Sequence, residues 1–167
     1  MKWNRGDIHD QTDLDEKFIT ETARIYNVPA HLIYALIEIE SAANAFALRY
    51  ESHYKYVYRV TAFAHASGLT GATEHQLQKF SWGLMQIMGG TARWLGFEKP
   101  LPLLLEPKIG VSWGTMYFGS LFKRYGNEAD AVSAYNQGSP RRHLLSSDYK
   151  NQEYVDKVFE ASVRYVT

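Results

Sequence analysis

The run Pro29-Ala-His-Leu-Ile-Tyr-Ala-Leu-Ile-Glu-Ile-Glu-Ser41 has the spacing of a helix that packs one face against a core. The apolar side chains on that face are Ile33, Leu36 and Ile37. Glu40 continues the same i, i+3, i+4, i+7 series. Glu38 lies about 200° around the helix from Glu40, at roughly 100° per residue, and is expected to face water. A carboxyl group therefore occupies a helix position at which a hydrophobic side chain is expected.

The position of Glu40 predicts an acid that keeps its proton near neutral pH. Partial burial removes water from a carboxylate and raises its pKa, and the negative end of the helix dipole acts in the same direction. A carboxylic acid that is still protonated is what general acid catalysis requires. The alternative is a helix end at which Glu40 bends out into solvent, and position alone favours that alternative.

The composition is that of a globular protein without a dominant charge. The 167 residues are 46% apolar and 22% charged, which excludes a disordered chain and predicts a single domain over residues 1–167. Lysines and arginines balance aspartates and glutamates, so no attraction to nucleic acid is implied. Cysteine is absent, which excludes disulfides and thiolate catalysis. No run of apolar residues is long enough to span a membrane, and residues 1–10 lack the apolar stretch of a signal peptide.

Capping residues and periodicity predict an all-α architecture. The expected helices cover residues 12–26, 29–40, 91–95, 106–125, 127–134 and 149–166. Residues 44–80 are ambiguous, because Tyr54, Tyr56 and Tyr58 alternate like a strand whereas residues 60–66 suit a helix equally well. The expected fold class is therefore all-α, with a small β-hairpin as an option in residues 44–80.

Four short segments follow one another in a distinctive order. They are Glu40-Ser41, Gly83-Leu-Met-Gln-Ile-Met-Gly-Gly-Thr-Ala92, the helical stretch 110–121 and Ala134-Tyr-Asn-Gln-Gly138. Glu-Ser carries no information alone, whereas Gly-Leu-Met-Gln-Ile-Met-x-x-Thr-Ala is specific. In this order the segments resemble the soluble lytic transglycosylase family, relatives of goose-type lysozyme in the lysozyme-like superfamily. The resemblance spans about residues 33–140 and implies a lysozyme-like fold.

The resemblance implies a role for seven residues. It makes Glu40 the catalytic acid and base. The residues that it places along the saccharide or beside the reacting sugar are Ser41, Gln86, Met88, Thr91, Tyr135 and Asn136. Among these, Gln86 offers a donor and an acceptor that suit an N-acetyl or hydroxyl group, and Tyr135 could aim its hydroxyl at Glu40 or at the substrate.

Each of these residues also has a purely structural interpretation. Met88 and Tyr135 could be core residues, and Gln86 could be an exposed helix residue. Thr91 could cap a helix, and Ser41 could fix the turn that follows Glu40.

The family reaction breaks the β-1,4 bond between N-acetylmuramic acid and N-acetylglucosamine in peptidoglycan. By this resemblance, protonated Glu40 gives its proton to the glycosidic oxygen as the bond breaks. Ionised Glu40 then takes a proton from the muramoyl C6 hydroxyl, which closes on C1. The product is a 1,6-anhydro sugar, so one carboxylate serves both steps and no water is consumed.

Hydrolysis on the same fold is the alternative reaction, and it needs a second carboxylate that holds water. Glu51 and Glu74 are the candidates between Glu40 and Gly83, with Glu51 preferred, although both could be structural or face solvent. This interval is longer than is typical of the family, and Ala45 stands where the family has proline. Tyr154-Val155 resembles the family's closing helix, but residues 150–152 just before it offer no acidic match.

No metal and no cofactor are expected. The histidines of the same interval are His53, His65 and His75. Their spacing matches no compact metal motif.

The expected partner is the peptidoglycan glycan strand, bound by a monomer. The missing signal peptide suggests a protein that is made in the cytoplasm and reaches the wall after release, as in phage lysis or a virion-associated, endolysin-type route. A third interpretation is a non-catalytic wall-binding or tail-structural domain.

Overall fold

The structure, a computed structural model, describes residues 4–12 and 14–166 and is mostly helical. Its α-helices are α1 (Arg5–Thr12), α2 (Glu16–Ile25), α3 (Ala30–Ser41), α4 (Val60–Ser67), α5 (Gly71–Gln78), α6 (Gly89–Trp94), α7 (Pro107–Tyr125), α8 (Glu128–Gln137) and α9 (Gln152–Ser162). Two 3-10 turns are η1 (Leu101–Leu105) and η2 (Val163–Tyr165). Three short strands, β1 (Leu48–Tyr50), β2 (Phe80–Trp82) and β3 (Ile87–Met88), form an antiparallel sheet in the order β1-β2-β3. The all-α, lysozyme-like prediction with a small β element is confirmed.

Side-chain caps explain where several helices begin. Glu106 accepts hydrogen bonds from the backbone N–H groups of Lys108 and Ile109, and Asn127 accepts one from Asp130, as expected for N-caps. The predicted start of the first long helix was wrong, because it placed the cap at residue 12. Residue 12 ends α1 instead, and Asp15 caps α2.

The strand expected at the alternating tyrosines is absent from residues 54–58. Strand β1 lies earlier, and its register pairs Leu48 with Trp82 and Tyr50 with Phe80. The segment at 54–58 instead packs on α6, where an added Cβ on Gly90 would meet the Tyr56 carbonyl oxygen at 2.5 Å. The alternating tyrosines therefore belong to an irregular segment, in which Tyr54 and Tyr58 are partly buried and Tyr56 is exposed.

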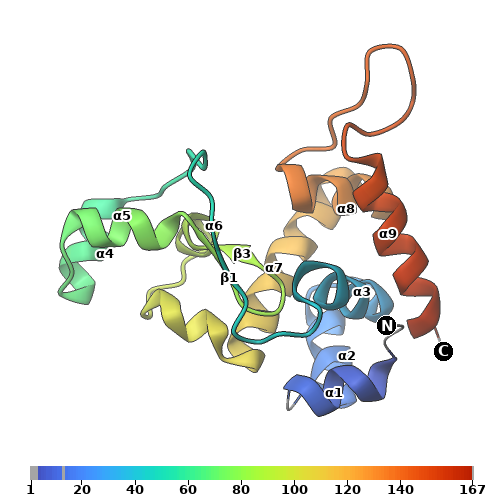
Figure 1. The fold of residues 1–167 in the computed structure, drawn as a ribbon, viewed down its shortest axis with the longest axis horizontal. Coiled ribbons are helices and arrows are strands. Elements are labelled where there is room, and N and C mark those ends of the chain that lie inside the picture. The colour runs from blue at the N-terminus through green and yellow to red at the C-terminus, as the bar shows by residue number, and fades with distance from the viewer. Residues whose placement is uncertain (1–3, 13, 167) are drawn as a thin grey trace.

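Two hydrophobic cores share the long helix α7. The larger core gathers buried residues of α1, α2, α3, α7, α8 and α9. The smaller core contains Trp82, Ile87, Ala92, Phe97, Leu101 and Leu104, and α7 residues Ile109, Trp113 and Tyr117 pack against it. Figure 1 shows α4 and α5 at one end of the molecule, α1, α2 and α9 at the other, and α7 between them.

The segment Gly83-Leu-Met-Gln86, which we call the motif turn, is held against α7 by close packing. A Cβ on Gly114 would lie 2.6 Å from the Met85 Cβ, and the Thr115 hydroxyl donates to the Met85 sulfur at 3.6 Å. Glycine in a helix interior costs up to about 1 kcal/mol relative to alanine. The close approach of the motif turn to α7 is the packing gain that offsets this cost.

A buried ion pair joins α5 to α6. Arg93 donates from Nε and Nη2 to the two carboxylate oxygens of Glu74 at 2.8 and 3.1 Å, and both side chains are 0% exposed. Gln78 also donates to Glu74, and the remaining guanidinium nitrogen of Arg93 donates to the carbonyl groups of Phe97 and Lys99. The polar atoms of the pair are thus satisfied, as burial requires.

We predict that Glu74→Gln lowers the free energy of unfolding by about 3–5 kcal/mol, because it leaves the Arg93 charge buried without a counter-charge. Urea denaturation measures the change. The matched control is Glu21→Gln, which removes an exposed pair with Lys17 and should cost less than about 1 kcal/mol. Equal effects of the two substitutions would contradict the structural role assigned to Glu74.

Within the described residues, none of the helices combines the length and the apolar character that are needed to cross a bilayer.

Candidate active site

A pocket of about 500 Å³ opens beside the C-terminal end of α3. It is lined by Ile39, Glu40, Arg49, Asn136, Lys150, Asn151, Glu153, Tyr154 and Lys157. These residues come from α3, β1, the end of α8, the two residues that precede α9, and α9 itself. Because α3 packs along α9, and α8 also packs on α9, the pocket lies where three helices meet.

Glu40 is partly buried in this pocket and receives a hydrogen bond from α9. The Tyr154 hydroxyl donates to Glu40 Oε1 at 2.5 Å. Burial raises the pKa of Glu40 above its ordinary value, and the hydrogen bond from Tyr154 and the positive charge of Arg49 offset only part of that rise. The pocket therefore holds a carboxyl group that favours its protonated form and has a donor ready for its ionised form.

Tyr135 lies near Glu40 but does not donate to it. Its hydroxyl donates to the Met85 carbonyl oxygen at 2.7 Å, and the side chain is buried on α8. Burial raises the pKa of Tyr135 well above its ordinary value, and the charge of Glu40 adds to that rise, so the two groups are within electrostatic reach. Tyr135 thus joins α8 to the motif turn beside the carboxyl group.

The side chains of Ser41 and Gln86 donate hydrogen bonds to backbone carbonyl groups of the protein itself. The Ser41 hydroxyl lies 3.0 Å from the Ile37 carbonyl oxygen and 2.8 Å from that of Leu84, which ties the end of α3 to the motif turn. The Gln86 amide nitrogen donates to the carbonyl groups of Gly83 and Ala47, and its oxygen accepts from Ser81. Gln86 also has a φ of 47°, so both its backbone and its side chain shape the turn.

Met88 and Thr91 lie at the start of α6. Met88 ends β3 and precedes the first helical residue, so it, and not Thr91, occupies the N-cap position. The Thr91 hydroxyl lies 3.2 Å from the Tyr54 hydroxyl. Asn136 is exposed at the pocket, where it accepts a hydrogen bond from Asn151 at 3.1 Å. The substrate roles of all these residues stay predictions.

The two carboxylates proposed for holding water take different positions. Glu74 is enclosed by Arg93, as described above, and does not reach solvent. Glu51 pairs with Arg49 at 2.5 Å, and Arg49 in turn lines the Glu40 pocket. Sequence reasoning missed Glu153, which stands directly before Tyr154 and lines the pocket itself. The adjacency of an acid and a tyrosine at the start of the last helix was the available signal.

Residues 17–156 match a family model described as the Transglycosylase SLT domain. The chain belongs to this family. The match covers most of the 167 residues and confirms the family resemblance, and it assigns to the protein, in general terms, lytic transglycosylase activity on peptidoglycan.

In this SLT domain Glu38 is not the water-facing residue that helix periodicity suggested. Arg164 donates to Glu38 at 2.5 Å and the Tyr165 hydroxyl donates at 2.7 Å, so the side chain is only 10% exposed. The chain after α9 covers this face of α3. Both glutamates of α3 are therefore contacted by the C-terminal part of the chain, Glu38 by η2 and Glu40 by α9.

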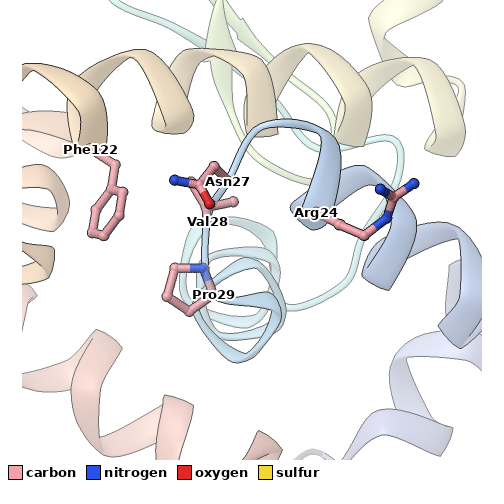
Figure 2. A pocket seen from close by; sticks show the side chains of 5 residues that line it. All are labelled: Arg24, Asn27, Val28, Pro29 and Phe122. Atoms are coloured by element: carbon pink, nitrogen blue, oxygen red, sulfur yellow. The ribbon is translucent and has the colours of Figure 1, made fainter.

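A second, smaller hollow of about 270 Å³ is lined by Arg24, Asn27, Val28, Pro29 and Phe122. Figure 2 shows that Arg24, Asn27, Val28 and Pro29 come from the end of α2 and the turn into α3, and Phe122 from α7. None of the five is an acid that could donate a proton to a glycosidic oxygen, so the Glu40 pocket is the candidate active site of the SLT domain.

Over the described range, residues 4–12 and 14–166, no group of three histidine, aspartate or glutamate side chains is arranged to hold a metal ion.

We predict that Glu40→Gln is more stable to urea than the parent SLT domain at neutral pH. The pKa of Glu40 is raised above 4.5 in the folded state, so stability from its protonated form is complete below pH 4.5 and is lost as pH rises through the folded pKa. The amide has no proton to lose. The stability difference should therefore close as the pH falls below about 4.

The exposed carboxylate Glu51 provides the control for this measurement. Glu51→Gln should change the free energy of unfolding by less than about 1 kcal/mol at either pH. If Glu40→Gln were less stable than the parent at pH 7, the desolvation of Glu40 would not be the dominant influence on its pKa.

Proposed function

We propose that this transglycosylase cleaves the bond between N-acetylmuramic acid and N-acetylglucosamine, with Glu40 as general acid and then general base. The observation that carries the proposal is the environment of Glu40. It is a carboxyl group with a raised pKa, at the edge of a pocket, with a single tyrosine donor. Such a group keeps its proton to a higher pH than an ordinary glutamic acid and can still ionise, and the proposed reaction uses both protonation states.

In the first step Glu40 gives its proton to the glycosidic oxygen as the C1–O bond breaks and positive charge develops on the sugar. Desolvation makes the proton available at a pH at which an ordinary glutamic acid would already have lost it. The carboxylate that remains is stabilised by the Tyr154 hydroxyl and by the nearby charge of Arg49.

In the second step ionised Glu40 removes the proton of the muramoyl C6 hydroxyl, and the C6 oxygen closes on C1. The product is a 1,6-anhydromuramic end, and Glu40 is again protonated. Because the nucleophile belongs to the substrate, the reaction needs no water and no second carboxylate. A pocket with one shielded acid suits this chemistry.

Two groups of residues support Glu40 in this proposal. The residues that we propose to contact the glycan through exposed or partly exposed side chains are Met88, Thr91 and Asn136. The residues that we propose to shape the substrate site through the motif turn are Ser41, Gln86 and Tyr135, since each hydrogen bonds to backbone in or beside that turn.

Glu40→Gln should abolish cleavage of purified sacculi, because the amide keeps the shape of the side chain and cannot transfer a proton. Mass spectrometry of the muropeptides released by the parent protein should find anhydro ends, which weigh one water less than reducing ends. A Glu40→Gln variant with most of the parent activity would refute the site. Failure of the parent protein to clear sacculi while still binding them would favour a wall-binding domain.

Tyr154→Phe should move the alkaline limb of the pH–activity profile to higher pH. The hydrogen bond from Tyr154 lowers the pKa of Glu40, so its removal raises that pKa and keeps the acid protonated at higher pH. The rate of turbidity loss between about pH 5 and 9 measures the shift. Tyr50→Phe, on β1, is the control and should leave the limb in place; a downward shift for Tyr154→Phe would contradict the proposal.

A hydrolytic muramidase is the second candidate function, and one observation favours it. Glu153 lines the same pocket as Glu40, and a hydrogen bond from Lys157 at 2.6 Å lowers the pKa of Glu153. An ionised carboxylate in this position could hold a water molecule for attack on C1. Both acids are paired with a cation, but Glu153 lines the pocket and Glu51 does not, so Glu153 is the better candidate for that role.

The products separate the two reactions. Muropeptides from the parent protein that carry predominantly reducing ends, together with loss of these products in Glu153→Gln, would establish the muramidase. Anhydro ends that persist in Glu153→Gln would establish the transglycosylase. We further propose that residues 1–167 act as one monomeric domain; the phage-lysis setting stays a prediction.

A further inference from the structure

Among the described residues, three cations line the Glu40 pocket, and they are not balanced equally. Lys157 donates at 2.6 Å to Glu153, which lines the pocket as well, so these two charges offset each other. Arg49 uses only Nε for its 2.5 Å pair with Glu51, a residue outside the pocket lining. In the part of the chain that the structure describes, the two terminal nitrogens of Arg49 meet no acceptor. Arg49 therefore keeps two donors and most of its fork geometry at the pocket.

Lys150 is the cation of this pocket that has no counter-charge. It ends the loop that joins α8 to α9 (Figure 1), and its backbone N–H donates to the Arg141 carbonyl oxygen at 2.8 Å, whereas its side chain is exposed. Over residues 4–12 and 14–166, its ammonium group forms no ion pair. Lys150 also stands in the short stretch before Tyr154 in which the sequence offers no acidic match to the family, so the resemblance does not account for this positive charge.

The side-chain amide of Asn136 presents a donor at the same pocket. The Oδ1 atom of Asn151 accepts hydrogen bonds from Ser133 at 2.8 Å and from Gln137 at 2.9 Å, which leaves its nitrogen as the donor. That nitrogen donates to Oδ1 of Asn136 at 3.1 Å. The Asn136 nitrogen, which meets no acceptor among the described residues, is therefore the end of the amide that remains for a ligand. Like the two cations, this end offers a donor and no acceptor.

We propose that Lys150, Arg49 and the Asn136 amide bind a carboxylate of the muramoyl substituent beside Glu40, and we call these three residues the carboxylate subsite. This inference deepens the proposed function and rests on it, because a muramoyl ring must lie at Glu40. The ring that reacts at C1 carries a lactyl ether on C3. The lactyl group ends in a carboxylate when it is free, and it bears an acidic stem peptide when it is substituted. Both sources place a carboxylate on the same sugar whose bond Glu40 would protonate.

A carboxylate matches the groups that the subsite offers. The planar guanidinium of Arg49 can bind both oxygens of one carboxylate, and the flexible stem of Lys150 lets its charge follow the ligand. A neutral substituent would leave both cations in water and gain nothing from them. Because the two side chains are exposed, screening by water and salt keeps the expected gain in affinity to about threefold to tenfold. The subsite therefore selects acidic glycan over neutral glycan.

The test measures binding to the Glu40→Gln variant, so that no probe is cleaved. The probes are three forms of one N-acetylglucosamine–N-acetylmuramic acid tetrasaccharide: with free lactyl carboxylates, with the lactyl groups as methyl amides, and with L-alanyl-D-glutamate stems. Isothermal titration calorimetry at low salt should find that at least one acidic probe binds about threefold to tenfold more tightly than the methyl amide. The acidic probe that shows the gain identifies the source of the carboxylate, and 0.5 M NaCl should remove most of the gain.

Substitution of Lys150 in the Glu40→Gln background connects the gain to the subsite. Lys150→Gln should remove most of the preference for the acidic probe, and Lys150→Arg should keep it, because the charge is retained. Lys123→Gln is the matched control, since it removes one exposed lysine charge on α7 outside the pocket lining, and it should keep the preference. Thermal unfolding of these variants should match that of the Glu40→Gln protein, since both lysine side chains are exposed.

Equal affinity for all three probes, binding of none of them, or a preference that survives Lys150→Gln in full would overturn the carboxylate subsite. Failure of the proposed function looks different, because Glu40→Gln would then still clear sacculi. Clearing that requires Glu40, together with equal affinity for the acidic and the methyl amide probes, would leave the proposed function intact and reject the subsite alone.

Discussion

The packing of α3 against α9 is the contact on which the proposed chemistry depends. It partly withdraws Glu40 from water, which raises the pKa of the carboxyl group, and it brings the Tyr154 hydroxyl to 2.5 Å from one carboxylate oxygen. Burial favours the neutral acid, and the hydrogen bond favours the anion. Neither influence alone would suit the proposed role, in which the group gives up a proton and then recovers one. The pocket combines both on one side chain.

The motif turn gives this contact a rigid neighbour. Ser41 ties it to α3, Tyr135 ties it to α8, and Gly114 lets Met85 sit directly on α7. Hydrogen bonds within the protein thus occupy polar groups that the sequence analysis had assigned to substrate binding. Gln86 is the clearest case, because its side-chain amide bonds to Gly83, Ala47 and Ser81. A specific motif can thus be required because it builds the site, even when its side chains point back into the protein.

Much of the fold could be predicted because its signals are local. Helix periodicity found the apolar face on which Glu40 lies, and single side chains such as Glu106 and Asn127 marked the starts of α7 and α8. The assignments that failed were those decided by distant parts of the chain. Glu38 is covered by η2, more than a hundred residues later, and no local pattern reports that contact.

The same limit applies to the site. Glu40 was found because its position conflicts with its own helix, but Tyr154 looks like an ordinary apolar-face residue of α9. Glu153 was overlooked although it directly precedes Tyr154, because nothing local shows that this part of α9 faces the end of α3. The alternation of Tyr54, Tyr56 and Tyr58 resembled a strand, but these residues form an irregular segment that packs closely on Gly90 of α6.

Glu40 and the hydroxyl that contacts it are separated by 114 positions in the chain. During synthesis from the N-terminus, α3 leaves the ribosome long before α9 does, and until then the carboxyl group remains in water with the acidity of a free glutamic acid. Under the proposed function, the growing polypeptide therefore cannot cleave polysaccharide until α9 docks on α3. The proposed activity is thus coupled to the docking of α9 on α3, and a chain in which that contact has not formed would lack it.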